Sequence, residues 1–192
     1  EHVLDALVDA GMERLVLVVG YRRERVQEHF GPSYRSVPIE YVVQRKQLGS
    51  GHALSQARET VDDPFLVVNG DRIIESNAVE SVADAFENDT APAALAVLER
   101  PDASRYGAVT LHDRDIAEIV EEPESDEYRL INAGVYAFSP SIFRAIDETP
   151  RQDGELALTD TIADLVERER VRGVRIGGLW VDATYPWDLL KV

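Results

Sequence analysis

Two carboxylates in the chain stand directly after short apolar runs. Asp71 follows the run Phe65–Val68 and an Asn-Gly pair. Asp182 follows Leu179-Trp180-Val181, close to the end of the sequence. If each run is a buried strand, both carboxylates lie at the edge of a sheet where open α/β folds bind ligands. Together they would hold a divalent cation that handles phosphates. The structural alternative is that Asp71 caps a turn and Asp182 begins a loop.

A glycine-containing turn, Gly49-Ser50-Gly51, separates a predicted strand from a predicted helix. Its glycines allow the backbone to approach a flat ligand, and the amides that open the helix favour an anion. The side-chain amide of Gln44, just before this turn, can pair with a nucleobase edge through one donor and one acceptor. The alternative is an ordinary strand-to-helix corner. His52 has no evident partner, so we interpret it as a surface or packing residue.

The elements that would position these residues follow from the apolar periodicity. We predict helices at 1–10, 22–30, 52–59, 77–87, 141–146 and 159–169, and strands at 15–19, 39–43, 65–68, 94–98, 107–111, 116–120, 131–138 and 174–181. Strands and helices alternate in the first half of the chain, which predicts βαβ units and a parallel sheet. From Ala93 onward, strands follow one another with few helices between them.

Composition restricts the class of protein. The chain has 192 residues, of which 44% are hydrophobic, enough for one α/β domain with its own core. Cysteine is absent, which excludes disulfides, thiolate metal sites and thiol catalysis. No apolar run approaches the length of a membrane span, and residue 1 already opens a helical pattern rather than a signal peptide. We therefore expect a cytoplasmic protein with no membrane partner.

The charge is strongly acidic. Asp and Glu outnumber Lys and Arg 36 to 20, giving a net charge of −16. Nucleic acid is excluded as a partner, because binding its phosphates requires basic patches and none is evident. An acidic shell suits a salty cytoplasm, where counterions screen the self-repulsion. We interpret the charge as an adaptation to salt rather than as a binding site.

Several motifs along the chain together resemble one family. In order they are Gln44 with Leu48-Gly49-Ser50-Gly51-His52-Ala53, Gly70-Asp71, Tyr106-Gly107, Ile119-Val120-Glu121, Asn132-Ala133-Gly134-Val135-Tyr136, Leu158-Thr159-Asp160 and Trp180-Val181-Asp182. This series is similar to the sugar-phosphate nucleotidyltransferases, which include glucose-1-phosphate thymidylyltransferases and N-acetylglucosamine-1-phosphate uridylyltransferases. The resemblance extends over essentially all 192 residues.

The resemblance implies a role for each matched residue. Gln44, Gly49 and Ser50 would bind the pyrimidine base of UTP or dTTP. Asp71 and Asp182 would be the catalytic residues that hold Mg²⁺ between the nucleotide and the sugar phosphate. The sugar pocket would be lined by Gly107, Glu121, Asn132 and Gly134. Two structural alternatives stay open: Asn132-Ala133-Gly134 as a strand bulge, and Glu121 as part of a solvated acidic run.

The resemblance also implies a fold, a Rossmann-like three-layer α/β/α nucleotidyltransferase domain over residues 1–192 with a mixed, mostly parallel sheet. Family members begin with a strand and a glycine-rich loop that binds the triphosphate, followed by a lysine before proline. None of these is in this sequence, so we expect the domain to be incomplete at its N-terminus. The ending Tyr185-Pro186-Trp187-Asp188 is similar to archaeal members in which a β-helix domain follows. Many relatives also have lysine where this chain has Glu122.

The expected activity is transfer of a nucleotidyl group to a sugar 1-phosphate, with release of pyrophosphate. The alternative is a regulatory subunit that binds a nucleotide or sugar nucleotide without turnover, although such subunits lose the metal carboxylates, which this chain keeps. A redox Rossmann domain fits poorly, because its glycine fingerprint does not follow the first strand. The sequence does not choose between UTP and dTTP, identify the sugar, or decide whether the protein is a homo-oligomer.

Overall fold

The structure is a computed structural model, and it describes every residue except 122, 124–126 and 192. Its α-helices are α1 (His2–Asp9), α2 (Arg23–Phe30), α3 (Ser50–Ser55), α4 (Ser76–Glu87), α5 (Ile142–Glu148) and α6 (Leu158–Val166). Short 3₁₀ helices lie at Ala103–Arg105 and Pro186–Lys191. The strands are β1 (Leu15–Val19), β2 (Ser33–Tyr34), β3 (Val37–Val43), β4 (Phe65–Val68), β5 (Arg72–Ile74), β6 (Ala93–Glu99), β7 (Ala108–His112), β8 (Asp115–Val120), β9 (Leu130–Phe138), β10 (Val171–Arg175) and β11 (Trp180–Asp182).

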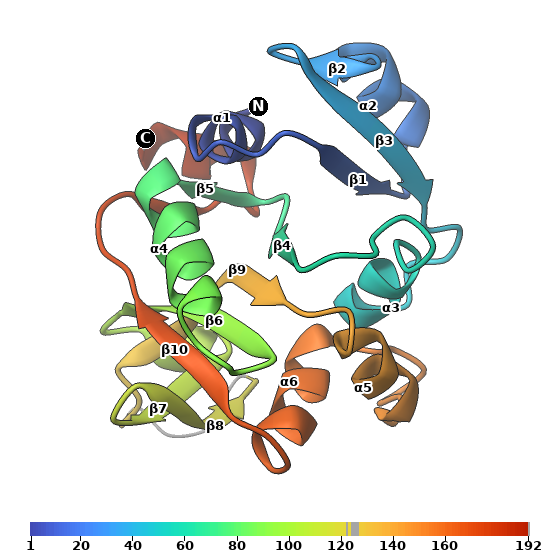
Figure 1. The fold of residues 1–192 in the computed structure, drawn as a ribbon. Coiled ribbons are helices and arrows are strands. Elements are labelled where there is room, and N and C mark those ends of the chain that lie inside the picture. The colour runs from blue at the N-terminus through green and yellow to red at the C-terminus, as the bar shows by residue number, and fades with distance from the viewer. Residues whose placement is uncertain (122, 124–126, 192) are drawn as a thin grey trace.

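The strands form a central six-stranded sheet in the order β4-β9-β6-β10-β8-β7, with a three-stranded sheet β1-β3-β2 and a pair β11-β5 beside it (Figure 1). The prediction of a mixed sheet is confirmed, but the prediction that it is mostly parallel is wrong. Among the described strands, only β1 with β3 and β6 with β10 pair in parallel. β4 instead pairs antiparallel with β9, a strand much later in the chain that inserts beside it.

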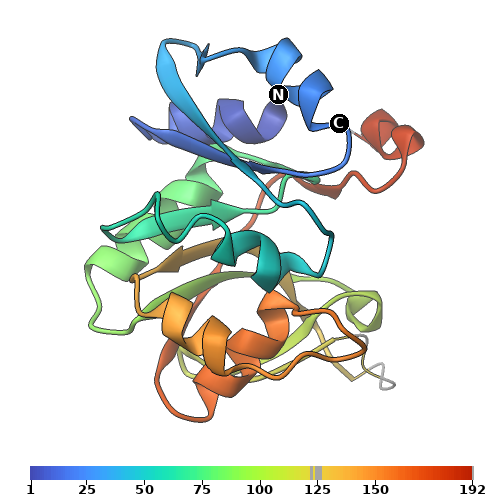
Figure 2. The same ribbon diagram turned by 90° about the vertical axis from the view of Figure 1, so that its right-hand side faces the viewer.

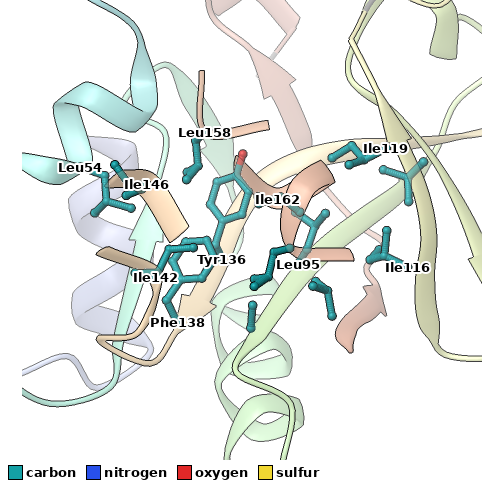
Figure 3. Close-up of a cluster of buried hydrophobic side chains, with 14 of the residues drawn as sticks. Leu54, Leu95, Ile116, Ile119, Tyr136, Phe138, Ile142, Ile146, Leu158 and Ile162 are labelled. Carbon is teal, nitrogen blue, oxygen red and sulfur yellow. The ribbon is translucent and has the colours of Figure 1, made fainter. Parts of the chain in front are cut away.

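The expected three layers are present, because helices cover both faces of the six-stranded sheet. Alternate side chains of β6 and β9 point to opposite faces. Leu95, Tyr136 and Phe138 pack on one face with residues of α3, α5 and α6, as Figure 3 shows. The other face carries small residues such as Ala94 and Ala96, on which Val79 and Val82 of α4 pack. Small side chains on this face allow α4 to approach the sheet closely.

The three-stranded sheet lies at one end of the molecule, beyond β4 (Figures 1 and 2). Leu15 of β1 and Ile39 of β3 form a separate small core with Leu4 of α1. In the described part of the chain, β1 pairs only with β3 and β4 only with β9, so each has one free edge.

Two further sequence predictions needed correction. The predicted strand 174–181 is two strands, β10 and β11, because Gly178 turns the backbone with φ +84° between them. β5 was missed, although it is the partner of β11.

Over the residues that the structure describes, no helix is both long enough and apolar enough to cross a membrane.

Candidate active site

The structure brings Asp71 and Asp182 together through the pairing of β5 with β11. In this antiparallel pair Asp182 lies opposite Arg72, and the backbone amide of Ala183 donates to the carbonyl oxygen of Asp71 over 2.8 Å. Arg72 Nη1 lies 2.6 Å from Asp182 Oδ1 and 3.1 Å from Asp71 Oδ1. The two carboxylates therefore face the same point, and that point is at present filled by a guanidinium group.

Trp180 and Thr184 fix the position of Asp182. The indole Nε1 of Trp180 donates to the carbonyl oxygen of Ala133 over 2.8 Å, which ties β11 to β9. The hydroxyl of Thr184 donates to Asp182 Oδ1 over 2.8 Å. The Asp182 side chain is 22% exposed and that of Asp71 is 53% exposed, so the pair opens to solvent mainly on the Asp71 side.

The donor set of this pair fits a magnesium ion. Two carboxylates are hard oxygen ligands, and Mg²⁺ usually keeps several waters and binds through one or two carboxylates together with substrate phosphates. No group of three or more potential metal ligands occurs in the described parts of the chain. The pair is therefore suited to a cation that substrate helps to hold, rather than to a closed protein cage.

Three of the predicted sugar-pocket residues also meet. A Cβ placed on Gly107 would lie 3.3 Å from Glu121 Oε1 and 3.5 Å from Asn132 Cβ, so the missing side chain at Gly107 leaves room beside both. The backbone N–H of Asn132 donates to the backbone carbonyl oxygen of Gly107 over 2.7 Å. Glu121 is exposed, as the alternative of a solvated residue requires, but it also borders this pocket.

The fourth residue, Gly134, lies in a β-bulge, so the structural alternative for Asn132-Ala133-Gly134 is correct as a description of the backbone. The pairing of β6 with β9 shifts between Leu95 and Val97, and Gly134 has φ +77°. Within the bulge, the amide of Gly134 donates to Asn132 Oδ1 over 3.0 Å. A Cβ on Gly134 would lie 3.2 Å from Arg72 Cγ, so the bulge connects the predicted sugar-binding residues to Asp71 and Asp182.

Tyr136 is a buried residue of β9 that holds the side chain of Asn132. Its hydroxyl accepts a hydrogen bond from Asn132 Nδ2 over 2.9 Å. Burial, with a smaller contribution from the negative charge of Glu121, raises the pKa of Tyr136 to about 12. The phenol therefore stays protonated and serves to hold Asn132 in place rather than to exchange protons.

The predicted base-binding residues form a second group at the carboxyl end of β3. Gln44 is buried, and its Nε2 donates to the carbonyl oxygen of Gly49 over 3.1 Å. The same nitrogen lies 3.0 Å from Nδ1 of His52. His52, which the sequence suggested to be a surface or packing residue with no evident partner, thus has a partner and orients Gln44. The only sequence signal was its place directly after the glycine turn.

Ser50 and Gly49 fasten the glycine turn to α6. The hydroxyl of Ser50 accepts from the amide of Leu158 over 2.9 Å. A Cβ on Gly49 would lie 2.3 Å from the carbonyl oxygen of Leu156, and Gly49 has φ +96°, so only glycine fits there. These contacts make the turn a rigid platform, with Gln44 at its edge.

The predicted site residues therefore form two groups. One contains the metal pair and the sugar-pocket residues, joined through Arg72 and the bulge of β9. The other is the glycine turn with Gln44. No hydrogen bond or ion pair of the described residues joins one group to the other. Glu122, the departure from the lysine of many relatives, lies outside the described residues.

The fold is a three-layer α/β domain, and comparison with known proteins identifies the family. The family model of nucleotidyl transferases matches residues 1–192. The chain is 38% identical over 97% of its length to the UTP–glucose-1-phosphate uridylyltransferase AglF of Haloferax volcanii, covering 79% of that protein. It is 34% identical over its whole length to a bifunctional protein GlmU of Methanococcus maripaludis, covering 45% of it.

Comparison with solved structures points to the same family. A chain described as a glucose-1-phosphate thymidylyltransferase from Bacillus anthracis, in complex with sucrose, superposes with a TM-score of 0.89 at 25% identity, covering 99% of this chain and 78% of the other. The protein therefore belongs to the sugar-phosphate nucleotidyltransferase family. It spans about half the length of the GlmU proteins that it matches.

Proposed function

We propose that the full protein transfers a nucleotidyl group from UTP or dTTP to a sugar 1-phosphate, with Mg²⁺ as its cofactor, and releases pyrophosphate. One observation carries this proposal: the carboxylates of Asp71 and Asp182 face one point. The bulge of β9 links that point to the predicted sugar pocket at Gly107. A sugar phosphate held in that pocket would present its phosphate to the metal pair. The name of AglF, a UTP–glucose-1-phosphate uridylyltransferase, supports the same chemistry.

The reaction requires positioning and charge neutralisation rather than a covalent intermediate. A sugar phosphate oxygen attacks the α-phosphorus in line with the departing pyrophosphate. Mg²⁺, when bound, neutralises charge on the phosphates of both substrates. Asp71 and Asp182 would hold that cation, Glu121 would accept hydrogen bonds from sugar hydroxyls, and Asn132, fixed by Tyr136, would bind another hydroxyl.

The contacts of Gln44 support a base that carries an imide N–H. Both hydrogens of its Nε2 are directed to partners inside the protein, the Gly49 carbonyl and His52 Nδ1. A flipped amide would put two oxygens face to face at Gly49, so the orientation is fixed. Oε1 is left as an acceptor for the ligand. Uracil and thymine offer an N3–H to such an acceptor, whereas cytosine offers a second acceptor at N3.

The sugar is proposed more broadly, as glucose or N-acetylglucosamine 1-phosphate. AglF is named for glucose 1-phosphate and is 38% identical to this chain. Glu121 and Asn132 can bind the hydroxyls that both sugars share, so these residues do not distinguish them.

The activity is tested by pyrophosphate release from the full-length protein with Mg²⁺, UTP or dTTP, and each sugar phosphate. Asp71→Asn removes one ligand charge but keeps the shape of the side chain. We expect it to lower kcat/KM by at least about 100-fold, because stabilisation of charge in the transition state is lost.

Asp113→Asn is the matched control. Asp113 is 91% exposed in the turn between β7 and β8, and Asn is suited to its positive φ of 58°. It removes the same charge far from the pair, and its activity should equal that of the wild type. Equal rates for Asp71→Asn and Asp113→Asn would remove the metal role. Nucleotide binding without any pyrophosphate release would favour the regulatory alternative.

The cellular setting and the extent of the protein are part of the same proposal. The net charge of −16 supports a cytoplasm rich in salt. Residues 1–192 would form the nucleotidyltransferase domain of a longer protein, with a β-helix domain as the expected addition. The free edges of β1 and β4 in the described part of the chain support the expectation of a further strand from outside this sequence.

A further inference from the structure

Arg72 fills the position in which a cation held by Asp71 and Asp182 would lie. Its Nη1 contacts one oxygen of each carboxylate, at 3.1 Å and 2.6 Å. Its side chain is only 13% exposed, so the positive charge is enclosed together with the pair. Without this charge, two carboxylates would face one another with no compensation.

The guanidinium group of Arg72 is poorly satisfied in this position. Arginine binds carboxylates best through two parallel N–H donors, but here one nitrogen serves both aspartates. Its Nε is buried and has no hydrogen-bond partner among the described residues. A buried donor without a partner is unfavourable by about 1–3 kcal/mol. The arrangement therefore holds the carboxylates together without fully satisfying the arginine.

Beyond the two carboxylates, the Arg72 side chain contacts Gly134 and Trp180. Its stem passes Gly134, where a Cβ would lie 3.2 Å from Arg72 Cγ, so the stem uses the room that glycine leaves. The guanidinium lies over the ring of Trp180, 5.3 Å from its centre. An aromatic face attracts a cation without fixing its orientation as a hydrogen bond would. Arg72 can thus turn away from the carboxylates while remaining in contact with Trp180.

We propose that Arg72 is a positioning residue that occupies the cation site in the metal-free protein and must be displaced when a divalent cation binds. This inference rests on the metal site of the proposed function. Arg72 would then compete with the divalent cation and weaken its binding in the absence of substrate. At the same time Arg72 would keep Asp71 and Asp182 in a geometry ready to receive the cation.

The test is titration of the full-length protein with Mn²⁺ alone, with free Mn²⁺ followed by its paramagnetic resonance signal. Arg72→Met removes the charge and keeps an apolar stem against Trp180. Losing a positive charge within a few ångströms of the cation should tighten Mn²⁺ binding by at least about tenfold. Arg72→Lys, which restores the charge, should bring the affinity back toward that of the wild type.

Arg100→Met is the matched control. Arg100 also lies over the Trp180 ring, at 5.6 Å, but it forms its hydrogen bonds with Asp102. Its replacement should leave Mn²⁺ affinity unchanged, which separates the charge of Arg72 from its packing on Trp180. Should Arg72→Met not fold, Arg72→Gln supplies a neutral and polar alternative, with circular dichroism as the check of folding.

Asp182→Asn distinguishes the failure of this inference from failure of the proposed function. If Asp182→Asn weakens Mn²⁺ binding but folded Arg72→Met or Arg72→Gln binds as the wild type does, the competition is refuted and the metal site stands. If Asp182→Asn binds Mn²⁺ like the wild type, the metal site itself is refuted.

Discussion

Arg72 and Arg172 each join two aspartates, but the two arginines differ in how many of their nitrogens take part. The Arg172 cluster is not fully bonded either, since the buried Oδ1 of Asp115 has no hydrogen-bond partner among the described residues. Arg172 donates to Asp89 through both Nε and Nη2, and its Nη1 lies 3.1 Å from Asp115 Oδ1. Arg72 reaches its two aspartates with one nitrogen. Both arginines are largely buried, at 13% and 19% exposed, so burial does not explain the difference.

Asp89 is satisfied from several directions. It accepts hydrogen bonds from the amides of Thr90 and Ala91, at 2.7 and 3.1 Å, and Arg170 also donates to it. The hydrogen bonds from Arg172 are the main reason that the pKa of Asp89 falls to about 2. These contacts fasten the loop after α4 to β10. Asp89 is therefore a structural anchor, whereas Arg72 has the incomplete donor bonding expected for the proposed exchange with a cation.

The largest expected difference is between Asp182→Asn and Asp89→Asn. Asp182→Asn should lower kcat/KM by at least about 100-fold in the pyrophosphate-release assay. Asp89→Asn should leave activity unchanged but lower the free energy of unfolding by about 1–3 kcal/mol, since it weakens hydrogen bonds to a charged group. Urea unfolding measures the second quantity. A folded Asp89→Asn protein with reduced activity would contradict the distinction between anchor and site.

The sequence was sufficient to place Asp71 and Asp182 at strand ends, because each follows an apolar run. It did not reveal Arg72, because the strand β5 that carries this residue was not predicted. The position of Arg72 depends on its pairing opposite Asp182, 110 residues away in the chain. Such a pairing has no local signature. His52 was missed for the same kind of reason, since its partner Gln44 lies just after the preceding strand, β3.

The sheet direction was mispredicted for a related reason. Alternating strands and helices indicated parallel neighbours, and this is correct for β1 and β3. The same pattern says nothing about a strand that inserts later, as β9 does between β4 and β6. Local periodicity therefore predicted the elements and the site-bearing ends, while the long-range pairing that completes the site required the structure.

Glycine substitutions near the two clusters offer a smaller contrast. Gly134→Ala would place a Cβ 3.0 Å from Asn69 Nδ2 and 3.2 Å from Arg72 Cγ, at a φ of +77°. A side chain in this backbone region is unfavourable by about 1–2 kcal/mol. We expect that loss of stability in urea unfolding, together with reduced activity, because both Arg72 and the bulge would have to move.

Gly173→Ala is the counterpart beside Arg172. Its Cβ would meet the end of the Leu111 side chain at 2.5 Å and that of Ile116 at 3.0 Å, both of which can turn aside. Stability should fall by less than for Gly134→Ala, with no change in activity. An equal effect of the two substitutions on activity would show that the bulge has no special relation to the site.

The smallest expected effect is the acid dependence of the Asp89 anchor. The folded-state pKa of Asp89, about 2, lies below the ordinary value of 3.8 because Arg172 and backbone amides stabilise its charged form. Its contribution to stability is therefore complete above the unfolded pKa and is lost as the pH falls from about 4 toward 2. The wild type should have the higher unfolding temperature at neutral pH, and its advantage over Asp89→Asn should shrink across that window. A difference that stays constant down to about pH 2 would show that the charge of Asp89 does not stabilise the fold.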